Sequence, residues 1–167
     1  DQQRIFRTLP GMCEARFLRL GVVHRNTYVD SPRCLDERMA LKNEPHVHLA
    51  GQITGCEGYV ESLAVGHLVA QLLRCEASQS DWRCPPDTTA LGALWGHLRG
   101  AHKAPGSAHE PNNIHWGLFP PLEGRWKKAE RKARRLERAR IDFKAWLEAT
   151  GQSVVLRKAN PTVRRIS

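Results

Sequence analysis

A strand, a glycine-rich turn and a long apolar helix follow one another near the middle of the chain, and this succession most constrains the fold. Residues 47–50 form a short apolar run, and residues 63–73 are too apolar and too long to be anything but a buried helix. Between them lie Gly51, Gly55 and Gly58. Glycine permits a tight turn and a close backbone approach, and a helix N-terminus offers unpaired N–H donors and a partial positive charge. The succession therefore predicts a βα unit that can receive an anionic or polar cofactor.

The spacing of these glycines leaves two interpretations open. It is Gly-x3-Gly-x2-Gly, whereas a dinucleotide-binding fingerprint is Gly-x-Gly-x2-Gly. The turn is therefore not the first βα turn of a Rossmann unit. It either approaches a ligand or ends a βα unit without one, because a fold does not dictate a function.

Composition narrows the class of protein. The 167 residues suffice for one domain or slightly more, and the net charge of +9 predicts a polyanionic partner. The five cysteines include no CxxC pair, which argues against a disulfide framework or a metal site and fits a reducing, cytoplasmic compartment. No apolar run reaches the roughly 18 residues of a membrane span, so no membrane association is expected. The chain begins without Met in what reads as the middle of a helix, so we expect part of a longer protein.

Shorter patterns predict the elements on either side of the central turn. The next helix, Thr89 to Arg99, is expected to be capped by Asp87 or Thr88 and to end at Gly100. The longest helix, about 124–149, is expected to turn one apolar face to the core. That face consists of Trp126, Ala129, Ala133, Leu136, Phe143 and Leu147. The remaining expectations are a helix at 1–8, extended segments at 15–20, 22–23 and 27–29, and a short strand at 154–156.

The first half of the longest helix is strongly basic. Nine Lys and Arg residues lie between Gly124 and Arg140, against only Glu130 and Glu137. A solvated helix face normally mixes signs, and like charges at this density repel one another unless an anion is near. We therefore weigh contact with the phosphate backbone of RNA against a merely solvated face. The residues predicted to contact RNA are Lys127, Lys128, Arg131, Lys132, Arg134, Arg135 and Arg138.

A second polar group, His24-Arg25-Asn26, lies between two predicted extended segments. It is either a polar turn or a contact for a small molecule, since imidazole stacks on flat heterocycles and guanidinium pairs with carboxylates. The other histidines show no ligand spacing, so no metal is expected. Cys56 lies in the glycine turn, where a helix N-terminus can lower a thiol pKa, although a small space-filling role is the simpler interpretation.

Several segments, taken together and in order, resemble the folate- and FAD-dependent tRNA (uracil-5-)-methyltransferase family, TrmFO. The similarity extends over about residues 1–150 and corresponds to the C-terminal part of that family. The related GidA (MnmG) flavoproteins share the Gly-Gln-x-x-Gly and Gly-Tyr-x-Glu elements but lack His-Arg-Asn-Thr. The segments are 9–12 (LPGM), 15–19 (ARFLR), 21–28 (GVVHRNTY), 31–32 (SP), 50–55 (AGQITG), 57–62 (EGYVES), 88–94 (TTALGAL), Asn113 and 116–122 (WGLFPPL).

The resemblance implies an α/β fold, namely the C-terminal portion of a glutathione-reductase-like FAD domain with part of its inserted domain, mostly helical after residue 60. Residues 1–45 would end the inserted substrate and folate domain, and residues 46–167 would end the FAD-binding domain. His24, Arg25 and Asn26 would contact folate. Backbone N–H groups from Ile53 to Gly55 would face the reduced flavin. The full set of implied FAD contacts is Gly51, Gln52, Ile53, Thr54, Gly55, Gly58, Tyr59 and Glu61.

The implied reaction is formation of 5-methyluridine in the T-loop of tRNA. Methylene-tetrahydrofolate would supply the carbon, and reduced FAD, recharged by NAD(P)H, would supply the electrons. The nucleophilic cysteines of the family belong to segments upstream of this chain, so no catalytic residue is assigned here. Two alternatives stay open, namely a GidA-like protein that modifies wobble uridine and a non-catalytic RNA-binding fragment. The oligomeric state is not predicted.

Overall fold

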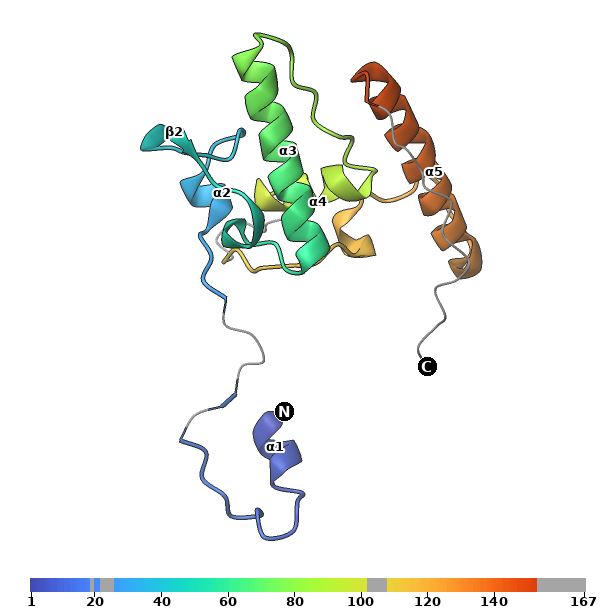
Figure 1. The fold of residues 1–167 in the computed structure, drawn as a ribbon. Coiled ribbons are helices and arrows are strands. Elements are labelled where there is room, and N and C mark those ends of the chain that lie inside the picture. Colours follow the sequence, from blue (N-terminus) through green and yellow to red (C-terminus); the bar gives the residue numbers. More distant parts are fainter. Residues whose placement is uncertain (19, 22–25, 102–107, 153–167) are drawn as a thin grey trace, which may run out of the picture.

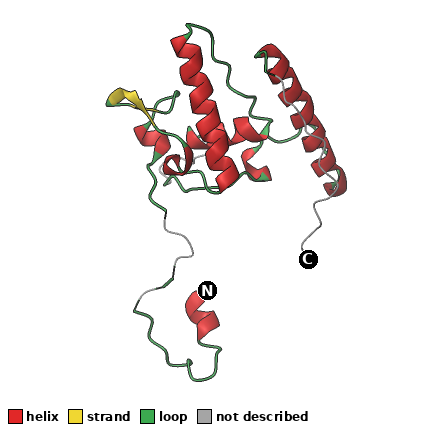
Figure 2. Cartoon of the chain, in the orientation of Figure 1, coloured by secondary structure: helices red, strands yellow, loops and turns green. Residues whose placement is uncertain are grey.

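Helices are the main regular structure of the described chain (Figures 1 and 2). The computed structural model describes residues 1–18, 20–21, 26–101 and 108–152. Within these ranges the only sheet is a two-stranded antiparallel pair, so the architecture is mixed, with a small sheet beside the helices. The elements are α1 (Gln2–Phe6), α2 (Ser31–Cys34), β1 (Ala40–Leu41), β2 (Glu44–His48), the 3-10 helix η1 (Gly51–Thr54), α3 (Tyr59–Ala77), α4 (Ala90–Leu98), the 3-10 helix η2 (Trp116–Leu118) and α5 (Lys128–Ala149).

The extended segments predicted near the N-terminus are not strands. Residues 15–18, 20 and 27–29 have irregular structure, and no described strand lies beside them to pair their backbones. Val29 instead donates its backbone N–H to the carbonyl of Ile53 at 2.9 Å. A strand needs a neighbouring strand as well as a suitable pattern. The predicted extended piece at 22–23 and the predicted strand at 154–156 lie outside the described residues.

The N-terminal helix α1 lies apart from the helical body (Figure 1). None of its residues is buried. Gln2 exchanges two hydrogen bonds with the backbone of Gly21, at 2.7 and 3.1 Å, and the rings of Phe6 and Phe17 lie 5.9 Å apart. The helix predicted at 1–8 is confirmed over a shorter length, and it packs on its own connecting segment.

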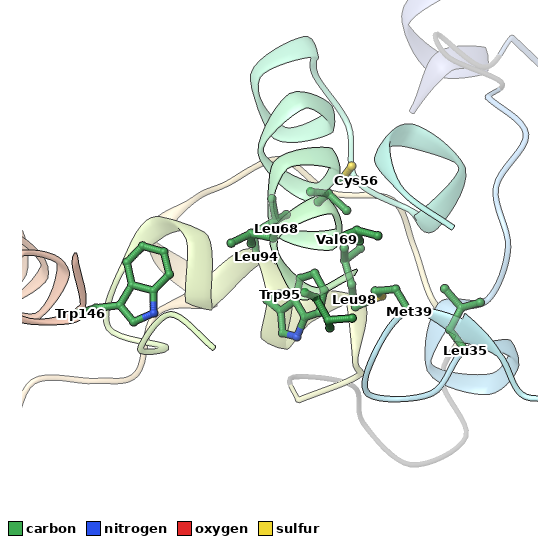
Figure 3. Packing of buried hydrophobic residues seen from close by; sticks show 11 residues of the cluster. Leu35, Met39, Cys56, Leu68, Val69, Leu94, Trp95, Leu98 and Trp146 are labelled. Atoms are coloured by element: carbon green, nitrogen blue, oxygen red, sulfur yellow. The ribbon is translucent and has the colours of Figure 1, made fainter. Parts of the chain in front are cut away.

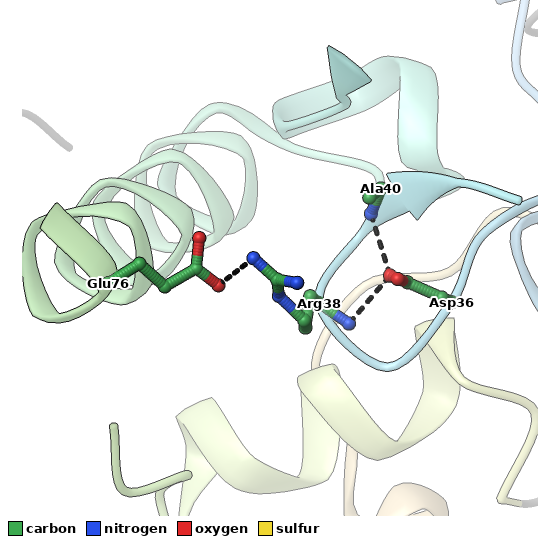
Figure 4. Close-up of polar contacts among 4 residues, drawn as sticks. All are labelled: Asp36, Arg38, Ala40 and Glu76. Atoms are coloured by element: carbon green, nitrogen blue, oxygen red, sulfur yellow. Dashed lines mark hydrogen bonds and ion pairs between the residues drawn. The ribbon is translucent and has the colours of Figure 1, made fainter. Parts of the chain in front are cut away.

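A tight turn leads into the hairpin of β1 and β2. The carboxylate of Asp36 accepts backbone N–H groups from Arg38 at 2.8 Å and Ala40 at 2.9 Å (Figure 4). This carboxylate supports the left-handed backbone of Met39 (φ 59°), whose side chain is fully buried. The guanidinium of Arg38 forms an ion pair with Glu76 and so joins the turn to the last turn of α3.

The hairpin spans the division predicted at residue 45. In β1 and β2, Ala40 pairs with His48 and Leu41 with Glu44. Leu35 and Met39, from the N-terminal side of the division, pack in the same core as α3 and α4 (Figure 3). The division into two domains stays a prediction, and the structure shows a core that draws on both sides of it.

Helix α3 is the central element of that core. The buried helix predicted at 63–73 is confirmed as a helix, and it extends from Tyr59 to Ala77. One face is buried and packs on α4 (Figure 3). The opposite face carries Leu63 at 75% exposure, so the apolar run is only half buried. The buried residues of α3 are Val65, Leu68, Val69 and Leu72.

The N-cap of α4 lies after both of the residues predicted to cap it. Thr89 is the N-cap, and its hydroxyl accepts the Gly92 N–H at 3.1 Å and donates to the Pro86 carbonyl at 2.6 Å. The hydroxyl of Thr88 instead donates to Asp142 on α5. Asp87 and Thr88 are therefore wrong as caps, whereas the predicted end at Gly100 (φ 81°) is confirmed.

Loss of this cap should be measurable in the stability of the chain. We expect Thr89→Ala to lower the free energy of unfolding by about 1–2 kcal/mol, because a buried hydroxyl that makes two hydrogen bonds is removed. Chemical denaturation followed by circular dichroism measures this change. Thr27→Ala, at an exposed threonine, is the matched control and should leave the midpoint unchanged. Equal midpoints for the two variants would contradict the assigned cap.

Helix α5 packs on the core only through its C-terminal half. Phe143, Trp146 and Leu147 contact the core, and the Trp146 indole donates to the Arg83 carbonyl at 2.9 Å. The predicted apolar face is wrong for the N-terminal half, where Ala129, Ala133 and Leu136 are exposed. Trp126 precedes the helix, which begins at Lys128. No helix in the described part of the chain is both long and apolar enough to cross a membrane.

Candidate functional site

The central strand, glycine turn and helix are present in the predicted order (Figure 1). The turn itself contains a short 3-10 helix, η1, before α3 begins. β2 ends at His48, η1 covers Gly51–Thr54, and α3 begins at Tyr59. Three glycines adopt left-handed backbone angles, with φ of 73° at Gly51, 90° at Gly55 and 87° at Gly58. Residues with side chains rarely adopt these angles, which explains the glycines at this spacing.

Thr54 and Gly55 lie under the turn and not at its surface. The buried Thr54 hydroxyl donates to the Gly51 carbonyl at 2.6 Å, and the Ser31 hydroxyl donates to the Thr54 carbonyl at 2.6 Å. A Cβ atom on Gly55 would lie 2.4 Å from Nε2 of the buried His109. These two predicted FAD contacts therefore hold the turn onto the core.

The free backbone donors lie at the start of α3. The Gly55 N–H, which was expected to face a flavin, already donates to the Gln52 carbonyl at 3.0 Å. In α3, the Ser62 N–H makes the first intrahelical bond, to Gly58 at 3.1 Å. The N–H groups of Tyr59, Val60 and Glu61 precede it and have no intrahelical partner. The donor set is thus displaced by about one helical turn from the prediction.

A pocket of about 430 Å³ opens beside this helix start, and we call it the turn pocket. It brings Asn26, a predicted folate contact, together with three predicted FAD contacts, Gln52, Gly58 and Tyr59. His24 and Arg25 lie outside the described residues. The remaining lining residues are Glu57, Ser62 and Asn113. The lining is therefore rich in carboxamides and hydroxyls, which can both donate to and accept from a polar heterocycle.

An exposed apolar face borders the turn pocket. Tyr59 is 92% exposed and Leu63 is 75% exposed, and the two lie one turn apart on the same side of α3. Val60, beside them, is 73% exposed. Large apolar side chains gathered at the edge of a polar pocket are typical of a ligand site or an interface.

Glu61 supports the turn pocket by accepting a hydrogen bond from the backbone of a distant segment. Its carboxylate accepts the Ile114 N–H at 3.2 Å, and the side chain does not line the turn pocket. Residues 55–57 and Asn112 exchange two further backbone bonds, Glu57 N–H to Asn112 at 2.9 Å and Asn112 N–H to Gly55 at 3.2 Å. Together these bonds hold the segment that carries Asn113 against the glycine turn. The predicted FAD contacts Gly51, Ile53 and Glu61 do not line the turn pocket, and their role toward FAD stays a prediction.

Three lining residues were missed as site residues. Glu57 and Ser62 lie within the EGYVES segment, so the motif itself could have indicated them. Asn113 lies 55 residues beyond Gly58 and reaches the pocket only through the backbone bonds of Asn112 and Ile114.

Cys56 is a packing residue. Its side chain is fully buried, and its sulfur lies 3.8 Å from the Ser62 hydroxyl. Burial raises the pKa of the Cys56 thiol, the opposite of the lowering that a helix N-terminus can produce. The space-filling interpretation is confirmed. Among the described residues, no group of three His, Cys, Asp or Glu side chains is placed to hold a metal ion.

The basic half of α5 forms a second candidate surface. All seven predicted RNA contacts are in or beside α5. None of them forms an ion pair with a described carboxylate. The ion pair within α5 joins two other residues, Lys144 and Glu148. Three of the seven, Arg131, Arg134 and Arg138, have structural partners, and the Arg131 Nε donates to the Trp126 carbonyl at 3.1 Å. The Arg138 guanidinium donates to the carbonyls of Pro120 and Pro121 at 2.6 and 2.9 Å, and the Arg134 guanidinium lies 3.4 Å from the Trp126 ring centre.

Comparison with known proteins identifies the family. Residues 1–81 match the family described as glucose inhibited division protein A. A relative from Myxococcus xanthus, named methylenetetrahydrofolate–tRNA-(uracil-5-)-methyltransferase TrmFO, is 49% identical over 152 residues, which are 90% of this chain and 33% of the relative. By sequence, the chain matches a segment of the TrmFO proteins. Proteins of the same name from Rhizorhabdus wittichii and Syntrophotalea carbinolica are each 49% identical, over 89% and 87% of this chain and 34% and 31% of their own lengths.

The TrmFO relationship confirms the resemblance carried by the motifs. The chain spans about a third of the length of these TrmFO relatives. The segments AGQITG and EGYVES, which carry the resemblance, form the glycine turn and the start of α3 in the structure.

Proposed function

We propose that this chain is the part of a TrmFO methyltransferase that forms one wall of the flavin and folate site and contacts tRNA. The whole enzyme would convert a T-loop uridine of tRNA to 5-methyluridine. The observation that carries this proposal is the turn pocket, in which Asn26 meets Gln52, Gly58 and Tyr59. These residues come from three of the motifs that the chain shares with the family, and the relatives bear the name of this activity.

The turn pocket fits part of a flavin. The amides of Gln52 and Asn113 can bond the polar edge of a flat heterocycle, and the exposed ring of Tyr59 can lie against it. The unpaired N–H groups at the start of α3 favour negative charge beside them. FAD, when bound, supplies the reducing electrons, and we assign their origin to NAD(P)H. At about 430 Å³ the turn pocket holds one ring system. We therefore assign the other FAD contacts to the two thirds of the enzyme that this chain does not cover in its relatives.

We assign folate to the side of the turn pocket marked by Asn26, with His24 and Arg25 as further contacts. Methylene-tetrahydrofolate would deliver the carbon there. In this scheme residues 1–45 end an inserted folate-side domain, and residues 46–167 end a glutathione-reductase-like FAD domain. The nucleophilic cysteine is assigned to another part of the enzyme, because Cys56 beside the turn is buried with a raised pKa. The proposed compartment is the cytoplasm.

A GidA-like modification of wobble uridine is the second candidate, because the matching family over residues 1–81 is glucose inhibited division protein A. The two candidates differ in the modified base and in the need for a folate. Both would use the same pocket for a flavin.

A hybrid enzyme separates the two candidates. This chain would replace the matching third of the Myxococcus xanthus relative, and tRNA would be assayed for 5-methyluridine with and without methylene-tetrahydrofolate. We expect folate-dependent 5-methyluridine, and Asn113→Ala should slow its formation about tenfold, because a polar partner is lost at a partly desolvated contact. Lys144→Gln, on the far half of α5, is the matched control and should not change the rate.

Flavin absorbance of the purified hybrid gives an independent readout. A hybrid that retains flavin yet modifies only the wobble position would overturn the methyltransferase assignment. Normal turnover of the Asn113→Ala hybrid would remove the turn pocket from the proposed site.

A further inference from the structure

A second pocket, lined by arginines and an indole, lies between the segment before α5 and the first turns of that helix. Its volume is about 460 Å³, and we call it the arginine pocket. Arg125, Trp126, Arg131 and Arg135 line it, together with Pro121 and Leu122. It shares no residue with the turn pocket. The size is in the range of pockets that hold one small molecule or one nucleotide.

The indole of Trp126 is held by two contacts, and the Trp126 backbone by a third. The indole Nε1 donates to the Glu123 carbonyl at 2.6 Å, and the backbone carbonyl of Trp126 accepts from Nε of Arg131 at 3.1 Å. The Arg134 guanidinium lies over the ring, 3.4 Å from its centre, yet Arg134 does not line the arginine pocket. A fixed aromatic ring presents a stacking surface at little cost in side-chain entropy.

The charge of the arginine pocket singles it out on this surface. It contains three guanidinium groups and no carboxylate. A neighbouring pocket that also includes Trp126 combines Arg134 and Arg138 with Glu123, Glu137 and Asp142, so its charges are mixed. The buried Nε of Arg135 has no hydrogen-bond partner among the described residues. An anion with oxygen acceptors would satisfy it.

We propose that the arginine pocket binds one unpaired nucleotide of the RNA substrate. The base would stack on Trp126, and the adjoining phosphates would bond to Arg131 and Arg135. The inference rests on the proposed function in one respect, namely that the substrate is an RNA. Bases in a duplex are already stacked on their neighbours, so only a nucleotide in a loop or single strand can offer its face. The remaining cations of α5 would add contacts that do not depend on pairing.

Binding of two RNA probes to the 167-residue chain tests the proposal. One probe is an unpaired dodecamer and the other is the same sequence annealed to its complement, both followed by fluorescence anisotropy. Trp126→Ala should weaken binding of the unpaired probe about tenfold and leave duplex binding within about twofold. Trp126→Phe keeps an aromatic face and should recover most of the lost affinity. Circular dichroism verifies that both variants are folded.

The arginines are tested through the salt dependence of the affinity. The double variant Arg131→Gln and Arg135→Gln should reduce the slope for the unpaired probe by about 1.4, since each phosphate contact to a single strand contributes about 0.7. Arg140→Gln, on the same helix but outside the pocket, should reduce it by about 0.7 at most.

Three outcomes would overturn the inference, and they are distinguishable. If RNA binds but Trp126→Ala affects neither probe, or both equally, the pocket assignment is wrong while RNA binding stands. A double arginine variant no different from Arg140→Gln has the same meaning. If the unmodified chain shows no salt-dependent affinity for either probe, the RNA contact in the proposed function fails, and this inference fails with it.

Discussion

Replacing Gly92 with alanine is expected to lower the free energy of unfolding by about 3 kcal/mol or more. Gly92 lies in the first turn of α4, and a Cβ atom there would lie 2.0 Å from the Pro86 carbonyl oxygen and 2.5 Å from that of Pro85. Both neighbours are backbone atoms, so no side-chain rotation relieves the overlap. Separating the loop from α4 would also break the cap, because Thr89 bonds to Pro86 and to the Gly92 N–H. Urea denaturation followed by circular dichroism measures the loss.

Gly66→Ala is the matched control for this prediction. Gly66 lies inside α3, and nothing lies within 4 Å of a Cβ atom built on it. Alanine has a higher helix propensity than glycine, so this variant should be neutral or more stable by up to about 1 kcal/mol. A Gly92→Ala variant as stable as Gly66→Ala would show that the loop before α4 yields freely.

The second large effect is expected at Gly55. Gly55→Ala combines a left-handed backbone (φ 90°) with a Cβ atom 2.4 Å from Nε2 and 2.9 Å from Cδ2 of His109. We expect a loss of about 2–4 kcal/mol, of which the backbone angle alone accounts for about 1–2 kcal/mol. Thermal unfolding gives the stability. Because Gly55 also accepts a bond from Asn112, any bound flavin should dissociate more readily from the variant of the hybrid enzyme.

Gly151→Ala separates the two causes. Gly151 also has a left-handed backbone (φ 64°), but nothing lies within 4 Å of its Cβ position. It should therefore show only the backbone cost. In a double-mutant cycle, His109→Ala should make Gly55→Ala less harmful, because the overlapping ring is gone. Additive losses in that cycle would place the cause elsewhere than in the His109 contact.

Long apolar patterns predicted helices well, and short patterns predicted strands badly. The run from 63 to 73 fixed the position of α3, because a helix satisfies its backbone within one segment. The pattern at 15–20 is typical of an extended segment, but its described residues have no neighbouring strand with which to pair. For α4 the sequence predicts Asp87 or Thr88 as the cap, whereas in the structure the Thr88 hydroxyl bonds Asp142 and Thr89 caps the helix.

The candidate site was predictable in its residue types and not in its geometry. The motifs placed Asn26, Gln52 and Tyr59 in one site, and the turn pocket contains all three. They could not show that the Gly55 N–H is used within the turn, or that Glu61 bonds Ile114. Asn113 is positioned by backbone bonds between distant segments, which leave no periodic trace in the sequence.

The helix α5 illustrates a further limit. Its periodicity predicted one continuous apolar face, yet only Phe143, Trp146 and Leu147 reach the core. A helical repeat states which residues share a side, and it does not state where a neighbouring element ends. The basic first half of α5 therefore lies on the surface.

The segment 112–122 is bonded at both of its ends. Asn112 is bonded to the glycine turn, and the carbonyls of Pro120 and Pro121 are held by Arg138 of α5. Leu118 and Phe119, between these ends, are buried against Ala93. The segment therefore connects residues that line the turn pocket to residues that line the arginine pocket. An insertion in it would lengthen this connection without altering a lining residue of the turn pocket, so under the proposed nucleotide binding its length would set the distance between the bound nucleotide and the turn pocket.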